Sequence, residues 1–161
     1  MNFRSKLLSL EELAGWRAAR RAAGARVVAT NGCFDLLHLG HVTYLEAARA
    51  LGDALLVGVN GDASVRALKG AGRPLNSERD RALVLAALAS VDAVYVFPEL
   101  TALAFLDRVR PDIYAKEAIT RWTPSTRRSG DLSRVMAAGW LCWAGVPGKS
   151  TTQLAHRLAA G

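Results

Sequence analysis

The 161-residue sequence has little cysteine and no long apolar run, and each shortage excludes a class of protein. Its two cysteines, Cys33 and Cys142, are too few for a disulfide framework and suit a reducing cytoplasm. No apolar segment is long enough to cross a membrane, and the basic start at Met1–Lys6 lacks the apolar stretch of a signal peptide. We therefore expect a cytoplasmic protein that does not enter a membrane.

The sequence also lacks aromatic residues interleaved with basic ones, although its formal net charge is +7. Such an excess of positive charge suits anionic ligands, among which nucleic acid is the usual alternative to small molecules. Because there is no platform for stacking bases, we expect a small phosphorylated ligand and no nucleic acid. With 51% hydrophobic residues, the chain is long enough for one domain with a proper core.

Apolar runs alternate with helical patterns along the chain, which predicts an α/β protein. Strands are expected at 26–30, 54–60, 93–97 and 113–116, and helices at about 9–24, 38–51, 62–68, 77–89 and 101–110. This alternation favours a Rossmann-like, doubly wound parallel sheet of about five strands, within a single domain over residues 1–161. Ligands of such sheets bind outside the carboxyl ends of the strands.

Residues 1–25 are expected to add a helix whose role is packing. Ser9 and Glu12 have the spacing of a capping box, and Gly24 is placed to end the helix. The arginines of this helix are expected to face water: Arg17, Arg20 and Arg21.

The stretch from Thr30 to His41 joins a strand, a glycine turn and a helix start. Such a junction offers free backbone N–H groups and the positive end of a helix dipole to an anion. His38 and His41 are three residues apart, so both imidazoles can face one phosphate, and Gly40 lets the ligand approach closely. Zinc binding is disfavoured because no third ligand has suitable spacing, and Cys33 has no evident base partner as a nucleophile.

The run His38-Leu39-Gly40-His41, after Gly32-Cys33-Phe34-Asp35, resembles the HxGH motif of the nucleotidyltransferase superfamily. The longer stretch from Asn31 to Gly72 is most similar to the heptose 1-phosphate adenylyltransferase family, in a free-standing form without a sugar-kinase domain. The resemblance covers about 26–116 and 146–158. It implies adenylyl transfer from ATP, with Mg²⁺, to D-glycero-D-manno-heptose 1-phosphate for lipopolysaccharide-core synthesis, and it suggests a homodimer.

Nucleotidyl transfer needs no covalent intermediate, so catalysis rests on positioning and on donors that stabilise developing negative charge. The residues predicted to be catalytic are His38, His41 and Lys69. Those predicted to bind the nucleotide are Asn31, Gly32, Cys33, Phe34, Asp35, Gly40, Arg73, Arg81, Ser150, Thr151 and Thr152. Asp35 is expected to fix the loop geometry rather than act as a base. The alternatives are solvated charges for Lys69, Arg73 and Arg81, and a simple helix cap for 150–152.

Residues 117–143 depart from the family's pattern. The family continues its fourth strand into Lys-Gly-Gly-Asp-Tyr, an acceptor-side loop, whereas this chain has Lys116-Glu117-Ala118-Ile119-Thr120. One hypothesis is translation from a shifted frame, and the other is true divergence. Both remove the loop aspartate and leave a fifth strand poorly specified. Besides heptose adenylyl transfer, two functions therefore stay open: cytidylyl or guanylyl transfer to another phosphorylated small molecule, and nucleotide binding without turnover.

Overall fold

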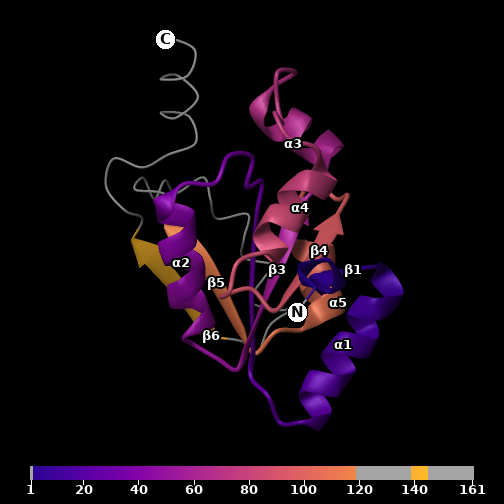
Figure 1. The fold of residues 1–161 in the computed structure, drawn as a ribbon, viewed down its shortest axis with the longest axis vertical. Coiled ribbons are helices and arrows are strands. Elements are labelled where there is room, and N and C mark those ends of the chain that lie inside the picture. The colour runs from indigo at the N-terminus through magenta and orange to yellow at the C-terminus, as the bar shows by residue number, and fades with distance from the viewer. Residues whose placement is uncertain (1, 119–138, 145–161) are drawn as a thin grey trace.

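The computed structural model describes residues 2–118 and 139–144, in which helices and strands alternate (Figure 1). The helices are the 3₁₀ helix η1 (Phe3–Lys6), α1 (Leu10–Ala22), α2 (Leu39–Arg49), α3 (Asp62–Lys69), α4 (Glu78–Ala86) and α5 (Leu103–Val109). The strands are β1 (Leu7–Leu8), β2 (Val27–Gly32), β3 (Ala54–Asn60), β4 (Ala93–Phe97), β5 (Ile113–Ala118) and β6 (Gly139–Ala144). Within these two ranges, no helix has the length and apolar character needed to cross a membrane.

The strands of the described residues form one six-stranded sheet in the order β1-β4-β3-β2-β5-β6, and all neighbouring pairs are parallel. The chain proceeds from β2 to β3 and β4 on one side, and then returns to β5 and β6 on the other. The predicted Rossmann-like α/β fold is confirmed, with β1 as an added edge strand that the sequence did not indicate. Since the order reverses between β2 and β5, the carboxyl ends of these two strands frame the expected ligand crevice.

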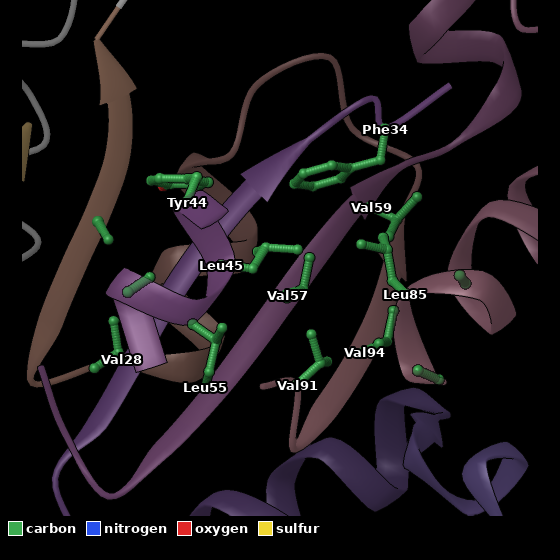
Figure 2. Packing of buried hydrophobic residues seen from close by; sticks show 14 residues of the cluster. Val28, Phe34, Tyr44, Leu45, Leu55, Val57, Val59, Leu85, Val91 and Val94 are labelled. Carbon is green, nitrogen blue, oxygen red and sulfur yellow. The ribbon is translucent and has the colours of Figure 1, made fainter. Parts of the chain in front are cut away.

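Apolar clusters cover both faces of the sheet. Val28 lies in the cluster beneath α2 and α4, together with Leu45 and Leu85 (Figure 2). Its neighbour Val27 points to the opposite face and packs with Phe105 beneath α1 and α5. Because both faces are covered, all seven residues of β3 are buried, which explains the continuous apolar run before Asn60.

The predicted capping box at the start of α1 is confirmed. Ser9 Oγ accepts a hydrogen bond from the Glu12 N–H at 3.2 Å, and Glu12 Oε2 accepts one from the Ser9 N–H at 2.7 Å. The two bonds satisfy donors that the first turn of a helix leaves without intrahelical partners. The helix ends at Ala22, and Gly24 follows with φ of +66°, in the left-handed region that suits glycine.

The prediction that Arg17 faces water is wrong. Its side chain is 8% exposed and crosses to the start of β5, where it pairs with Asp112 at 3.3 Å. Its Nε donates to the Val109 carbonyl at 3.0 Å, and its Nη2 donates to the Arg110 carbonyl at 2.9 Å. These carbonyls belong to the C-terminal end of α5, where a cation is favoured. Arg17 therefore joins α1 to α5 and β5.

The described residues of the atypical segment at 117–143 are the last two residues of β5 and most of β6. β6 pairs with β5 in parallel, with Ile113 opposite Gly139 and Ala118 opposite Ala144. The sequence over 121–143 has no clear period and did not predict this strand. Residues 119–138 and 145–161 lie outside the described residues. The shifted frame, the rival divergence and the single domain over 1–161 therefore stay predictions.

We expect Gly58→Ala to lower the free energy of unfolding by about 1–3 kcal/mol, as overpacking of a core does. An added Cβ would lie 2.8 Å from the ring of Phe105, which is fully buried and stacks on Phe97. Urea unfolding monitored by circular dichroism tests this. The matched control is Gly15→Ala within α1, where nothing lies within 4 Å of the added carbon. Helix propensity predicts that this control gains about 1 kcal/mol. Equal stability of the two variants would contradict the argument.

Candidate functional site

The loop after β2 passes through an unusual backbone conformation. Phe34 has a φ of +46°, in the left-handed region that a non-glycine residue occupies only when its surroundings hold it there. Its ring is 7% exposed and packs into the cluster beneath α2 and α4 (Figure 2). Gly32 precedes it, and a Cβ at Gly32 would lie 3.0 Å from the Phe34 ring. Burial of this ring therefore anchors the turn that joins β2 to α2.

The two histidines meet at the start of α2, with His38 as its N-cap. Their rings stack with centroids 3.9 Å apart, and Phe34 meets His41 edge-on at 5.4 Å. The His38 backbone N–H donates to His41 Nδ1 at 3.4 Å. This bond assigns the proton of a neutral His41 to Nε2, which can then donate to a ligand. Gly40, also predicted for the site, is buried in the first turn.

His41 is neutral at physiological pH. Burial, with smaller contributions from the charges of His38 and Lys69, lowers its pKa to about 4. A neutral imidazole at a helix N-terminus offers a hydrogen-bond donor without a permanent charge. We therefore expect His41 to donate a hydrogen bond to a phosphate oxygen whose negative charge is balanced by other groups.

Lys69 supplies the cation of this site. It is the last residue of α3 and is exposed, yet its charge acts on both His41 and Cys33. Burial raises the pKa of the Cys33 thiol, although the charges of Lys69 and Arg81 oppose this. A protonated thiol is a poor nucleophile, which disfavours Cys33 as a nucleophile.

Asp35 fixes the loop that follows α3. Its carboxylate pairs with Arg73 at 2.6 Å and accepts the backbone N–H groups of Leu75 at 2.7 Å and Asn76 at 3.3 Å. Burial raises the pKa of Asp35, but the bonds from Arg73 and these two N–H groups lower it overall below its usual value. The expected loop-fixing role of Asp35 agrees with these bonds. Arg73, predicted to bind the nucleotide, takes part in fixing this loop through its Nη1, and its contact with phosphate stays a prediction.

Arg81, also predicted to bind the nucleotide, is buried. Its side chain is 1% exposed, and its hydrogen bonds go to the carbonyls of Asn76, Cys33 and Asn60 and to the carboxylate of Asp62. The bonds to Asn60 and Asp62 both measure 2.8 Å. These acceptors lie at the ends of three separate segments. Arg81 therefore ties these segments of the site together.

Asn31 receives a contact that the sequence did not indicate. It lies near the carboxyl end of β2 and accepts a hydrogen bond from the hydroxyl of Tyr114, a residue of β5. Tyr114 lies two residues before Lys116 in the predicted strand, and nothing in the sequence indicated a polar partner for its hydroxyl. The predicted residues Ser150, Thr151 and Thr152 lie outside the described residues.

Comparisons with known proteins agree with this arrangement. A family model described as cytidylyltransferase-like matches residues 29–129. The chain is 48% identical over 156 residues to the bifunctional protein HldE of Magnetococcus marinus, covering 93% of this chain and 32% of that one. It is 57% identical over 110 residues to the bifunctional protein HldE of Pseudomonas paraeruginosa, covering 68% and 23%. The chain thus spans about a third or less of the length of these relatives.

A solved structure is also similar. The lipopolysaccharide core biosynthesis protein of Thermoplasma volcanium GSS1 superposes with a TM-score of 0.66 at 27% sequence identity. The match covers 76% of this chain and 99% of that chain.

Proposed function

Because this chain belongs to the cytidylyltransferase-like family and is a nucleotidyltransferase, we propose that it transfers the adenylyl group of ATP to D-glycero-D-manno-heptose 1-phosphate. The observation that carries the proposal is the stacked pair of His38 and His41 at the start of α2, beside Lys69. The choice of a heptose phosphate as the acceptor follows the resemblance of the stretch from Asn31 to Gly72, and the similar solved structure is named as a lipopolysaccharide core biosynthesis protein.

In the proposed reaction, an oxygen of the acceptor phosphate attacks the α-phosphorus of ATP in line. The new P–O bond forms as the bond to the β-phosphate breaks, and pyrophosphate leaves with the electron pair. His41 Nε2–H donates to a phosphate oxygen of the nucleotide, and Lys69 balances charge that develops on the leaving group. Backbone N–H groups of the 32–34 turn hold the remaining oxygens.

Magnesium enters this proposal with ATP, as the complex of its phosphates. In the described part of the chain, no three His, Cys, Asp or Glu residues come together in a way that fits a metal ion. In this proposal the phosphates of ATP hold the Mg²⁺. Its chemistry would be to offset phosphate charge. The homodimer likewise remains a proposal.

The test measures pyrophosphate release by the purified chain with ATP and heptose 1-phosphate. We expect ADP-heptose and one pyrophosphate per turnover. Parallel reactions with CTP or GTP and other sugar phosphates test the alternative base choices. If only CTP with another acceptor supports release, the proposed substrates are wrong. If ATP binds in a His41-dependent way but no acceptor supports release, the chain is a nucleotide-binding protein without turnover.

A further inference from the structure

The strands β2 and β5 are neighbours at the point where the strand order reverses. In their register Ala29 lies opposite Tyr114, and Asn31 is two residues further along β2 toward its carboxyl end. Side chains two apart on a strand share a face, so Asn31 belongs to the face of Val27 and Ala29. The hydroxyl of Thr30, by contrast, bonds Tyr44 of α2 on the other face, at 2.7 Å.

Tyr114 brings one polar atom to this place. Its side chain belongs to the cluster beneath α1 and α5 and is 1% exposed, yet its hydroxyl donates to Asn31 Oδ1. Burial raises the pKa of Tyr114 to about 12, so the hydroxyl stays protonated and remains a donor at physiological pH.

The contact decides which end of the Asn31 amide is available. Because Oδ1 accepts from Tyr114, the amide presents its NH₂ group, which carries two donors. Within the described residues no hydrogen-bond partner holds this NH₂ group, and the side chain is half-buried at the mouth of the crevice. A free amide can rotate and offer its oxygen instead, which would repel a phosphate.

We infer that Tyr114 is a positioning residue, which fixes the Asn31 amide so that its NH₂ group donates to a phosphate oxygen of a substrate. This inference rests on the proposed function, since it names a further contact of the same site. The phosphate comes from the nucleotide or from the sugar phosphate. In both cases Asn31 meets it from the sheet face opposite α2, and the two histidines meet it from the start of α2.

The first test compares two hydroxyl deletions, Tyr114→Phe and Tyr44→Phe. Each removes one buried hydrogen bond to β2 and keeps the ring, so each should lower Tm by about 3 °C. We expect Tyr114→Phe to lower kcat/KM by about 5- to 30-fold, mostly through KM, and Tyr44→Phe to leave it within about 2-fold. Equal kinetic effects of the two variants would overturn the inference.

The second test adds Asn31→Asp, which keeps an acceptor for Tyr114 but replaces the NH₂ donors by a negative charge. We expect about a 100-fold loss of kcat/KM. The double variant with Tyr114→Phe should be no worse than Asn31→Asp alone, because the hydroxyl acts through the amide. Additive losses would show that Tyr114 acts independently and would contradict the inference.

A third measurement separates this inference from the proposed function. The Asn31 side-chain NH₂ signals in ¹⁵N NMR, identified by their loss in Asn31→Asp, are followed with ATP alone and with heptose 1-phosphate alone. We expect one ligand to shift them in the wild type, and to shift them less in Tyr114→Phe. The responding ligand identifies the source of the phosphate. If the signals shift but no product forms, the proposed function fails and this inference stands; if neither ligand shifts them, the inference fails.

Discussion

Replacing His41 with alanine is expected to lower kcat/KM by about 10²–10³-fold, the usual effect of removing one preorganised donor at a developing negative charge. The donor is Nε2–H, because Nδ1 accepts the His38 backbone N–H. The loss should appear in kcat more than in the affinity for ATP, since charge builds up mainly in the transition state. Pyrophosphate release at saturating ATP measures it.

Two replacements of His41 give matched controls. Gln can place an amide N–H near the position of Nε2, whereas Asn places its N–H near the position of Nδ1. We expect His41→Gln to recover part of the activity that His41→Ala loses, and His41→Asn to recover none. Activity of His41→Ala within 3-fold of the wild type would contradict the assigned role.

The pH dependence of folding provides an independent test of His41. Its pKa is about 4 in the folded chain, against about 6.5 in an unfolded one. Between these values the unfolded chain binds more protons, so stability falls as the pH drops from about 6.5 toward about 4. We expect His41→Gln to flatten this part of the curve in urea unfolding. An unchanged curve would show that His41 is not buried in its neutral form.

The backbone of the fold could be predicted where sequence patterns are local. The run Leu55–Val59 is apolar throughout and follows Gly52 and Asp53, so the bounds of β3 were predicted to the residue. The family was predicted from the HxGH motif and is confirmed by the family model. The two-residue strand β1 was missed because so short a segment has no period, and its pairing depends on distant β4.

The roles of charged side chains could not be predicted in the same way. Arg17, Arg73 and Arg81 were expected to face water or phosphate, and all three have partners that are distant in the sequence. A hydrophobic period shows which face of a helix is buried, but it does not show which backbone carbonyl groups of other segments lie near that helix. An arginine can donate hydrogen bonds to several such carbonyl groups, and only the tertiary structure shows which carbonyl groups these are.

The largest effect on stability is expected at Arg81. Replacing it with methionine, which has a similar length and no donors, should lower the free energy of unfolding by about 3–5 kcal/mol. Three carbonyls lose a donor, those of Cys33, Asn60 and Asn76, and Asp62 loses its cation. Arg79 lies two residues away and is exposed, so Arg79→Met should change the free energy of unfolding by no more than about 0.5 kcal/mol. Urea unfolding of both variants measures the difference.

The same pair of variants separates the two roles considered for Arg81. If Arg81 binds phosphate, its replacement leaves the stability without nucleotide unchanged and reduces the rise in Tm that ATP causes. If Arg81 instead ties the segments of the site together, its replacement lowers Tm even without nucleotide. Its loss also weakens the site indirectly, because the Cys33 carbonyl and the start of α3 are no longer fixed to α4. We expect the second pattern, with most of the lost stability already present without ATP. A normal Tm combined with lost ATP affinity would restore the phosphate-binding role that the sequence predicted.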